Sequence, residues 1–284
     1  MIVISAASGM LGRLVIDRLL TQVPAGEVVA VVRTPAAAAD LAARGIQVRH
    51  GDYDDPAGLR EAFGGARRLL LISSPELDPA RRLAQHLAAV DAARAAGVGA
   101  LAYTSFLGAG TDGTGVTEAH HATERAILGS GLPYTMLRHP YYSEAFLNSG
   151  LRAAVASGEL TDSTGGRALN TASRADLAEA AANVLTGEGH LGRGYDFTGP
   201  LWTYPQLAQV LGQVSGVPVA YREVPDGASG ALRWLNGQVR AGALETQTED
   251  LQRVLGHPAT SLRQAVTAVL APSRSGTAPA TPAG

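Results

Sequence analysis

The chain has 284 residues, of which 46% are hydrophobic and 17% are charged, so it can bury a large core in one domain or in one domain with a smaller partner. A net charge of −2 gives no electrostatic reason to bind nucleic acid, and the absence of cysteine excludes disulfides, thiolate metal sites and redox thiols. All 23 basic residues are arginine, so every lysine-dependent site is excluded as well.

We expect neither a membrane span nor an export signal in this sequence. No apolar run approaches about 18 residues, so we expect no membrane span. The N-terminus lacks a basic region followed by a cleavage site, so we expect no signal peptide. The sequence therefore predicts a cytoplasmic protein that binds neither a membrane nor nucleic acid.

The first predicted strand, 2–5, runs directly into a glycine-containing turn and then into a predicted helix over 10–22. A strand, a tight glycine turn and a helix form the context in which glycines indicate dinucleotide binding. Glycines let the backbone approach a pyrophosphate, whose charge then lies at the N–H groups of the helix N-terminus. An ordinary turn between a strand and a helix is the alternative interpretation. The predicted cofactor-binding residues of this turn are Ala6, Ser8, Gly9, Met10, Leu11 and Gly12.

The turn departs from the usual glycine pattern at one position. In the spacing G-x-x-G-x-x-G, Ala6 replaces the first glycine, and Gly9 and Gly12 supply the other two. Alanine can take this place only if the turn needs no positive φ there.

The second predicted strand, 28–32, consists of four valines and one alanine and ends at Arg33, which is 21 residues after Gly12. An NAD-binding protein places Asp or Glu at such a position for the ribose 2′-hydroxyl, and a carboxylate there would repel a 2′-phosphate. An arginine instead offers a planar fork to the phosphate and stacks on adenine. The sequence therefore predicts NADPH or NADP as the cofactor. A solvated arginine at a strand end is the alternative.

The pattern continues with strands predicted at 46–50, 69–72, 100–104 and 134–138, separated by helices predicted at 36–44, 56–63, 79–96 and 118–130. Continuous apolar strands between helices imply a parallel sheet that is covered on both faces. Gly97 and Gly131 lie where glycines commonly end helices. The predicted fold class is α/β with a doubly wound parallel sheet, whose ligands lie beyond the carboxyl ends of the strands.

Polar and aromatic residues follow four of these strands at the edge where a cofactor would lie. A carboxylate and an aromatic ring in 51–54 could reach the adenine, and the small hydroxyls in 72–75 would let the cofactor pass closely. Residues 103–106 follow the next strand, and aromatic residues in 138–144 could frame the nicotinamide and a planar substrate. The predicted cofactor-binding residues of these segments are Asp52, Ser73, Ser74, Pro75, His139, Pro140, Tyr141, Tyr142, Ser143 and Glu144.

After residue 139 the strict alternation fades. We predict helices at 143–157, 174–186 and 204–215, strands near 195–198 and 218–224, and a turn-rich segment at 161–167. The stretch 226–250 is interrupted by glycine and polar residues and fits a helical lid or cap. The predicted domains are a cofactor domain over 1–140, a smaller α/β substrate lobe over 141–271 with some elements returning to the first domain, and a disordered tail over 272–284.

The Tyr-x-x-x-Lys dyad that protonates an alkoxide in ketone reductases is missing. The helix over 118–130 instead carries His120, His121 and Arg125, of which the last two share a face. Hydride addition to a quinone gives a stabilised anion, which solvent or a weak acid such as either histidine can protonate, so positioning supplies most of the acceleration. The missing dyad therefore favours quinone-like, dye-like or other conjugated acceptors. The alternative is that both histidines lie on a solvated face of the helix.

The candidate catalytic residues are His121, His139, Tyr141 and Tyr142. We expect no metal site, because the pairs His120-His121 and Asp54-Asp55 are adjacent rather than spaced to ligate an ion from one face. No G-x-S-x-G elbow and no cysteine or lysine nucleophile is present, so nothing supports covalent catalysis.

Several motifs together resemble the NmrA-like branch of the atypical short-chain dehydrogenase/reductases. They are the turn 6–12, Val32-Arg33, the segment 51–54 and Tyr103-Thr104-Ser105. Within this branch, six further segments are similar to the type-2 NADPH:quinone oxidoreductases: 71–74, 120–125, 134–138, 142–144, 171–176 and 256–258. The sibling group of triphenylmethane dye reductases shares most of these features. The resemblance extends over roughly residues 1–270.

The resemblance implies a Rossmann domain and a smaller C-terminal substrate-binding lobe, with NADPH in the cleft between them. The implied cofactor residues are the turn 6–12, Arg33, the segment 73–75 and the stretch after Arg138. The sequence departs from this family at Ala6, which replaces a glycine, and at His139-Pro140-Tyr141, which replaces the Asn-Gly-Trp expected beside the nicotinamide. The first departure concerns pyrophosphate binding and the second concerns the choice of substrate.

The leading hypothesis is an NADPH-dependent reductase that transfers a hydride directly to a quinone or a similar conjugated acceptor, without flavin. A redox sensor of the NmrA-like type, which binds dinucleotide and a regulatory partner without catalysis, is the alternative from another class. A dye or imine reductase would differ from the leading hypothesis only in its substrate pocket. Homodimers are common for such folds, but no residue of the sequence argues for one.

Overall fold

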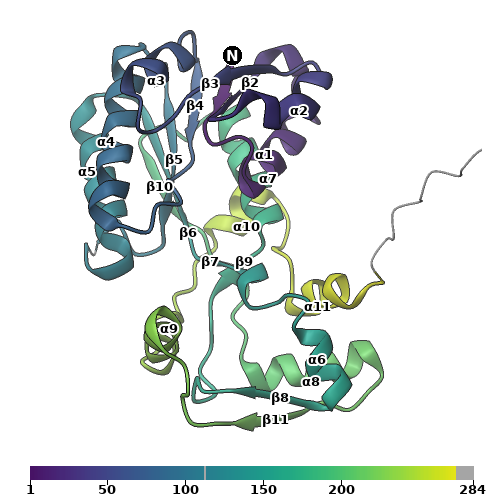
Figure 1. Ribbon diagram of the computed structural model, residues 1–284. Coiled ribbons are helices and arrows are strands. Elements are labelled where there is room, and N and C mark those ends of the chain that lie inside the picture. Colours follow the sequence, from purple (N-terminus) through teal and green to yellow (C-terminus); the bar gives the residue numbers. More distant parts are fainter. Residues whose placement is uncertain (112, 273–284) are drawn as a thin grey trace, which may run out of the picture. The chain divides into compact units, whose positions relative to one another are not determined.

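The computed structural model describes residues 1–111 and 113–272 of the chain (Figure 1). Contacts within the chain divide these residues into two compact units. Unit 1 comprises Met1–Glu144, Asn170–Leu201 and Leu244–Thr260, and unit 2 comprises Ala145–Leu169, Trp202–Ala243 and the described residues from Ser261 on. Apart from Pro272, the predicted disordered tail 272–284 lies outside the described residues.

A seven-stranded parallel sheet forms the centre of unit 1 (Figure 1). The strands lie in the order β10-β6-β5-β4-β1-β2-β3, and every neighbouring pair is parallel. The strand bounds are β1 (Ile2–Ile4), β2 (Val28–Val32), β3 (Gln47–His50), β4 (Arg68–Leu71), β5 (Leu101–Phe106), β6 (Tyr134–His139) and β10 (Arg193–Asp196). The chain therefore winds in opposite directions from the neighbouring strands β1 and β4, which confirms the predicted doubly wound sheet.

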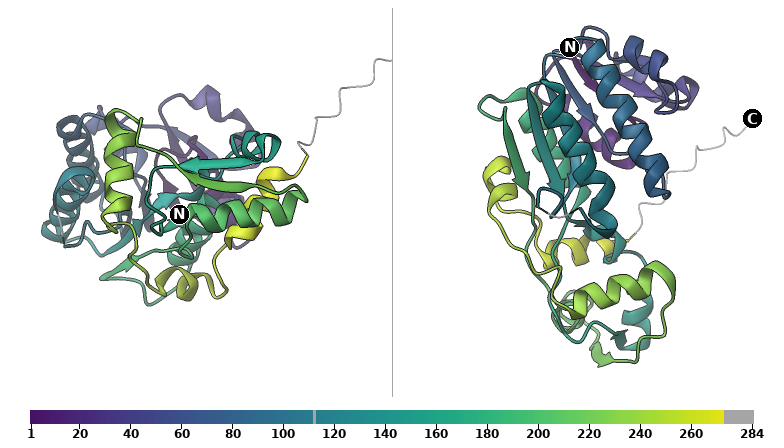
Figure 2. Two further views of the ribbon diagram at one scale, coloured as in Figure 1. Left: turned by 90° about the horizontal axis from the view of Figure 1, so that it is seen from below. Right: turned by 90° about the vertical axis from the view of Figure 1, so that its left-hand side faces the viewer.

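Helices cover both faces of this sheet. On one face α1 (Met10–Leu19) packs against α7 (Arg174–Thr186), and α10 (Asp250–Leu255) packs on α7. On the other face α4 (Pro79–Ala95) lies between α3 (Pro56–Ala62) and α5 (Glu118–Ser130), a face that the right-hand view of Figure 2 shows from outside. The short helix α2 (Ala39–Ala43) lies beside β3.

The central strands are apolar throughout because both of their faces are buried. Ile2 and Ile4 belong to the core beneath α1 and α7, whereas Val3 between them belongs to the core beneath α3 and α4. The same alternation continues along β2, where the residues at 28, 30 and 32 join the first core and those at 29 and 31 the second. This period of two follows from the pleat of a strand.

Side chains and glycines set the ends of several helices. Asp55 and Asp78 cap α3 and α4 by accepting backbone N–H groups of the first turn, and Ser173 does the same for α7. Gly97 and Gly131 have φ of +65° and +77°, which confirms that they end their helices in the left-handed conformation.

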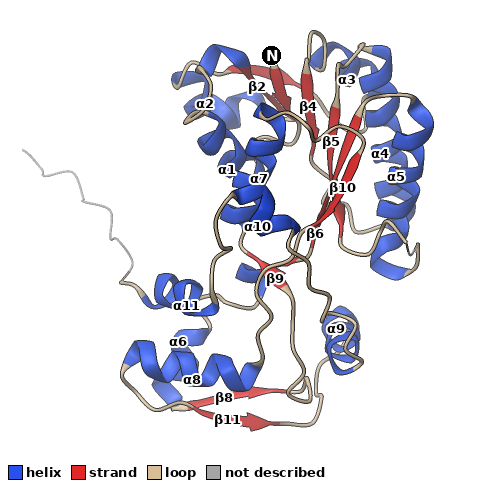
Figure 3. Cartoon of the chain, turned by 180° about the vertical axis from the view of Figure 1, so that it is seen from behind, coloured by secondary structure: helices blue, strands red, loops and turns tan. Residues whose placement is uncertain are grey.

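Unit 2 is smaller and contains one two-stranded parallel sheet, seen from behind in Figure 3. Its elements are β8 (Glu159–Asp162), β11 (Ala220–Glu223), α6 (Leu151–Ser157), α8 (Tyr204–Ser215), α9 (Gly230–Arg240) and α11 (Leu262–Leu270). Helix α8 packs on both strands and contacts α6 and α11. Both α8 and α11 begin with a capping box, formed by Thr203 with Gln206 and by Ser261 with Gln264.

The structure corrects the predicted helix over 143–157. Residues Ser143–Ala145 form a single 3₁₀ turn, and α6 begins only at Leu151. The intervening Asn148 accepts the N–H of Gly150 with its side chain, a local turn that competes with a continuous helix. Just before the turn, β7 (Tyr141–Tyr142) pairs in parallel with β9 (Thr171–Ala172) in unit 1.

Candidate functional site

The carboxyl ends of β1 and β4 mark the place where a doubly wound sheet binds ligands, because the chain winds away from this point on both sides. A cavity of about 430 Å³ lies here. Four segments of unit 1 line it: the turn after β1, the end of β2 with Arg33, the segment 51–54 after β3, and the segment 74–77 after β4. Leu59 of α3 and two side chains of α4 complete the lining. The position is that of a dinucleotide site.

The turn after β1 is tied by backbone hydrogen bonds on both sides. The N–H of Ala7 donates to the carbonyl of Val31 (3.1 Å), and the N–H of Gly9 donates to the carbonyl of Ala6 (3.0 Å). The chain must therefore reverse sharply after β1, and Ala6 has φ of +47°. The condition stated for an alanine at this position, a turn without positive φ, is wrong. Ala6 is the only non-glycine residue with positive φ within 1–111 and 113–272.

The two glycines of the turn have different roles. A Cβ on Gly12 would lie 2.8 Å from the carbonyl oxygen of Ala6 and 2.8 Å from the Cα of Ala7. Only glycine therefore allows α1 to approach the turn so closely. A Cβ on Gly9 would lie 3.2 Å from the same oxygen, and Gly9 lines the cavity. No side chain caps the N-terminus of α1 at Gly9, which leaves backbone N–H groups of the first turn for a ligand.

Buried hydroxyl groups hold the floor of this cavity. The Tyr53 hydroxyl donates to the carbonyl of Ile72 (2.5 Å) and accepts from the Ser5 hydroxyl (2.6 Å), which in turn accepts the N–H of Ile72 (2.9 Å). The closed network joins the ends of β1, β3 and β4. Burial raises the pKa of Tyr53, so its hydroxyl stays protonated.

Arg33 lies at the rim of the cavity as an exposed cation. Within the described part of the chain its guanidinium has no ion pair, whereas Arg13 is held by Asp40 at 2.5 Å. The charge of Arg33 acts on Asp54 without forming an ion pair, so Arg33 can bind a phosphate without breaking an existing pair.

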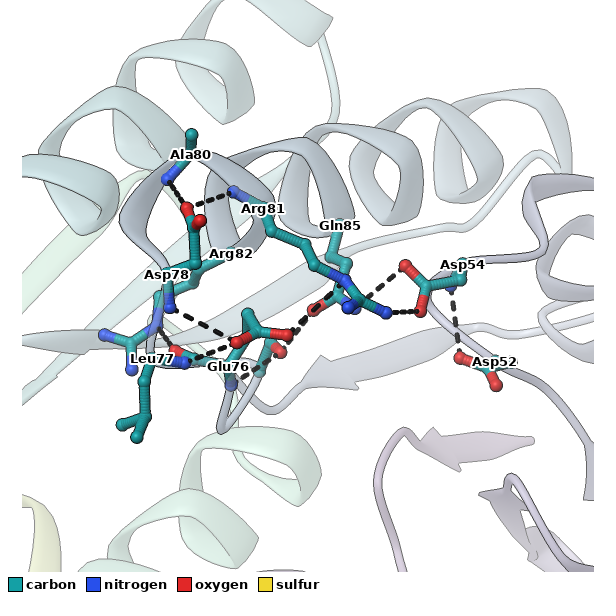
Figure 4. Close-up of polar contacts among 10 residues, drawn as sticks. Asp52, Asp54, Glu76, Leu77, Asp78, Ala80, Arg81, Arg82 and Gln85 are labelled. Carbon is teal, nitrogen blue, oxygen red and sulfur yellow. Dashed lines mark hydrogen bonds and ion pairs between the residues drawn. The ribbon is translucent and has the colours of Figure 1, made fainter.

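Opposite charges meet at another part of the rim, shown in Figure 4. Arg81 forms ion pairs with Asp54 (2.9 Å) and Glu76 (3.4 Å), and Gln85 donates to the second oxygen of Asp54 (2.9 Å). The bonds from Gln85 and Arg81 lower the pKa of Asp54. Asp52 accepts the N–H of Asp54 (3.1 Å). Glu76, Arg81 and Gln85 are site residues that the sequence pattern does not predict. Glu76 lies in the loop after β4, whereas Arg81 and Gln85 reach the cavity from α4.

A second cavity, of about 180 Å³, lies at the ends of β5 and β6 and shares Ser74 with the first. Ser73, Phe106 and Tyr141 are among its lining residues, together with two histidines, His120 and His139. The rings of Phe106 and Tyr141 meet edge to face, with centroids 5.1 Å apart. Five of its eleven lining residues carry aromatic rings, which suits a planar ligand, and Arg82 adds a cation to the wall.

His139 is a buried histidine without hydrogen bonds. It is 3% exposed, and neither ring nitrogen has a partner within the described residues. Its ring stacks on Phe197, with centroids 5.9 Å apart. Burial lowers the pKa of His139 to about 3, so the ring is neutral. Two unpaired buried nitrogens beside a cavity are the kind of exception that a bound ligand explains.

Tyr142 is held by a neighbouring cation. The Arg174 guanidinium lies 4.3 Å from the centroid of the Tyr142 ring and pairs with Glu144 at 3.5 Å. Glu144 also accepts the backbone N–H of Arg174. Arg174 therefore fixes Tyr142 against the smaller cavity.

The two cavities bring together many of the predicted site residues. Those that line the larger cavity are Ala6, Ser8, Gly9, Arg33, Asp52, Ser74 and Pro75. Those that line the smaller cavity are Ser73, Ser74, His139, Pro140, Tyr141 and Tyr142.

Six predicted residues line neither cavity: Met10, Leu11, Gly12, His121, Ser143 and Glu144. Met10 is 67% exposed, and Leu11 is buried in the core. Nδ1 of His121 donates to the carbonyl of Ala109 (2.7 Å), and the Ser143 hydroxyl donates to that of Thr171 (2.9 Å). The histidine of α5 that lines a cavity is His120, not His121.

No group of three or more histidine, aspartate or glutamate side chains in the described residues could hold a metal ion. Nor does any helix in 1–111 and 113–272 combine the length and apolar character needed to cross a membrane.

A family model described as "NAD(P)H-binding" matches residues 6–188 of the chain. Quinone oxidoreductase 2 of Escherichia coli is 40% identical over 281 residues, which cover 94% of this chain and 97% of the relative. An NmrA-like family domain-containing oxidoreductase of Aspergillus flavus is 31% identical over 78% of this chain and 74% of the relative.

Two solved structures are similar over almost the whole chain. The Citrobacter sp. triphenylmethane reductase complexed with NADP(H) has a TM-score of 0.89 and 37% identity, covering 95% of this chain and 100% of the other. The NADPH-dependent quinone oxidoreductase from E. coli complexed with NADPH has a TM-score of 0.86 and 39% identity, covering 95% and 99%.

Proposed function

Since the chain belongs to the NAD(P)H-binding, NmrA-like family that includes quinone oxidoreductase 2, we propose that it is an NADPH-dependent reductase of quinones or similar conjugated acceptors and needs no flavin. The single observation that carries the proposal is the pair of cavities that share Ser74 at the carboxyl edge of the sheet. One presents a glycine turn and an arginine without an ion pair among the described residues, and the other presents aromatic rings together with Arg82.

The residues of the larger cavity fit the adenosine and phosphate groups of NADPH. The backbone of the turn 6–9 and the first N–H groups of α1 would hold the pyrophosphate, because Gly9 and Gly12 leave no side chain in the way. Arg33 would bind the 2′-phosphate with a charge-assisted bond. When bound, NADPH supplies the hydride. Its nicotinamide end would lie in the smaller cavity, where the two unpaired ring nitrogens of His139 could form hydrogen bonds with it.

The proton chemistry of the smaller cavity favours a conjugated acceptor. Burial raises the pKa of Tyr103 and Tyr141, so neither hydroxyl is an activated acid. No lysine is present to lower a tyrosine pKa. An acceptor whose reduced anion is delocalised needs no strong acid, and holding it against the nicotinamide supplies most of the acceleration.

A dye reductase is the second candidate, and the similarity to triphenylmethane reductase favours it. The two acceptors differ in charge: a triphenylmethane dye is a cation without a carbonyl oxygen, whereas a quinone becomes an oxyanion. The cytoplasmic location remains a prediction from the sequence, and a homodimer remains an expectation from the fold alone.

The test is NADPH oxidation by the purified chain with a panel of quinones and triphenylmethane dyes, without added flavin and with NADH in parallel. We expect turnover with NADPH preferred over NADH. Tight NADPH binding without turnover of any acceptor would contradict a reductase and support the redox sensor.

A further inference from the structure

A buried chain of hydrogen bonds adjoins the smaller cavity and joins three elements of unit 1. It runs through His86 of α4, Tyr103 of β5 and His120 of α5. None of the three side chains is more than 6% exposed. Only His120 lines the cavity. The donor and the acceptor of each bond can be assigned from the contacts of His86, at the end of the chain away from the cavity.

The backbone of Ser74 determines which ring nitrogen of His86 carries the proton. The backbone N–H of Ser74 donates to Nε2 of His86 at 2.9 Å, so Nε2 carries no proton. Burial, together with the nearby His120 and Arg82, lowers the pKa of His86 to about 3, so the ring is neutral near pH 7. The single proton of His86 therefore lies on Nδ1.

The proton on Nδ1 of His86 decides what Tyr103 does. Nδ1 lies 3.2 Å from the Tyr103 hydroxyl and 3.0 Å from the Thr123 hydroxyl, which itself donates to a backbone carbonyl of α5. Both hydroxyl oxygens can therefore only accept from His86. Tyr103 then donates its proton to Nδ1 of His120, which at 2.9 Å is nearer than His86.

His120 is thereby left with its proton on Nε2. Its Nδ1 accepts from Tyr103, and burial together with Arg82 lowers the pKa of His120 to about 4, so one proton remains on the ring. Nε2 of His120 has no hydrogen bond within the described residues 1–111 and 113–272. His120, which lines the cavity, therefore carries a neutral Nε2–H donor that has no partner among the described residues.

We propose that His120 donates a hydrogen bond from Nε2–H to the carbonyl oxygen of a quinone in the smaller cavity, an inference that rests on the proposed quinone reduction. Negative charge develops on this oxygen as the quinone accepts a hydride. A fixed donor aimed at such charge accelerates a reaction by about 10²–10³-fold. Arg82 already lines this cavity as a cation, and a neutral imidazole adds a directed donor without adding a second charge. Tyr103 and His86 are positioning residues that keep the proton on Nε2.

The chain of hydrogen bonds orients His120 and does not conduct protons. It begins at the backbone N–H of Ser74, which cannot release its proton, so no proton can follow along the chain. The quinone gains two electrons and one proton as a hydride from NADPH, which becomes NADP⁺, and takes its second proton from water. Hydroquinone and NADP⁺ are the products.

The first test compares His120→Phe with His120→Gln. Phenylalanine keeps an aromatic ring but removes the donor, and we expect kcat for quinone reduction to fall by about 10²–10³-fold while the NADPH Kd stays unchanged. Glutamine offers an amide N–H in place of Nε2–H and an oxygen that accepts from Tyr103, so we expect it to recover most of the rate. Should the phenylalanine variant fail to fold, the glutamine variant and the tautomer measurement below decide the question.

A matched control is His190→Phe. His190 also pairs its Nδ1 with a tyrosine hydroxyl, that of Tyr195 at 2.8 Å, but it lines neither cavity. We expect it to leave kcat unchanged. A cationic triphenylmethane dye is the matched acceptor, because hydride addition to its central carbon cancels a charge and forms no oxyanion. His120→Phe should lower the ratio of quinone to dye turnover, and an equal loss for both would show a structural role.

Nitrogen NMR of the imidazole rings tests the tautomer without any turnover. We expect the proton of His120 on Nε2 in the wild type, and a mixture of tautomers with a lower quinone kcat in Tyr103→Phe. A proton on Nδ1 in the wild type, or a His120→Phe variant with the wild-type quinone kcat, would overturn the inference while leaving quinone reduction intact. If the wild type binds NADPH but reduces no quinone, the proposed function fails instead.

Discussion

The carbonyl oxygen of Ala6 lies 2.8 Å from where the Cβ of a side chain on Gly12 would be placed. The same carbonyl accepts the N–H of Gly9, and Ala6 reaches this position only with φ of +47°. The turn that would hold the pyrophosphate thus combines a close approach that requires glycine with one residue under backbone strain.

Relief of that strain should stabilise the protein. Replacing Ala6 by glycine removes the cost of a left-handed residue but frees the unfolded chain, so we expect Ala6→Gly to raise the free energy of unfolding by up to about 1 kcal/mol. Urea denaturation measures the change. The matched control is Ala7→Gly, because Ala7 is fully buried and has ordinary φ, so this variant should lose stability. Equal losses in both variants would show that the Ala6 conformation carries no strain.

Arg33 should discriminate between the two nicotinamide cofactors. We expect Arg33→Ala to weaken NADPH binding by about 1–3 kcal/mol, the scale of a charge-assisted contact, and to leave NADH binding almost unchanged. Fluorescence titration with both cofactors provides the comparison. Arg60→Ala, which removes an exposed arginine of α3 that lines neither cavity, should alter neither affinity. An equal loss for NADPH and NADH in Arg33→Ala would refute a bond to the 2′-phosphate.

His139 should be destabilising in the free protein. His139→Phe keeps the stacking on Phe197 and removes two unpaired buried nitrogens, so we expect the free energy of unfolding to rise by about 1–3 kcal/mol. The NADPH Kd should rise in the same variant if bound nicotinamide pairs with the ring. Unchanged or reduced stability without NADPH would mean that the nitrogens are satisfied in solution.

The buried histidines should make the protein sensitive to acid. Burial lowers the pKa of His139 to about 3 and, with neighbouring charges, that of His86 to about 3 and of His120 to about 4. The unfolded chain therefore binds protons that the fold excludes, so stability present above pH about 6.5 is lost as the pH falls towards these values. Each ring contributes up to about 1.4 kcal/mol per pH unit in this range.

Unfolding curves at pH 7 and pH 5 test the acid effect, because these two pH values lie above and below the ordinary histidine pKa of about 6.5. His139→Phe removes one of the three groups and should lose less stability between the two conditions than the wild type does. A parallel loss in both proteins would show that His139 is protonated in the fold.

The sheet could be predicted because its strands are short apolar runs, which fit neither an amphipathic helix nor an exposed loop. The run 28–32 is fully buried on both faces and can only be a central strand, and the helices between such runs begin and end at aspartates and glycines that act locally. The helix α11 was missed, although its capping box at Ser261 and Gln264 is a readable signal. The break before α6 depends on a side-chain turn at Asn148, which periodicity does not reveal.

The site could be predicted where it follows single strands, and not where it joins several elements. Arg33 and Ser74 could be predicted because Arg33 directly follows β2 and Ser74 lies three residues after the end of β4. The bonds between His86, Tyr103 and His120 depend on how α4 and α5 rotate against β5, which the sequence does not show. The same rotation decides that His120 rather than His121 reaches the cavity wall.

The most direct measurement is a single turnover of the protein–NADPH complex mixed rapidly with a quinone, with no flavin present. We predict that NADPH absorbance is lost in one step and that one hydroquinone forms for each NADPH oxidised. A complex that keeps its NADPH unoxidised with every quinone, or reacts only after flavin is added, would contradict direct hydride transfer in this site.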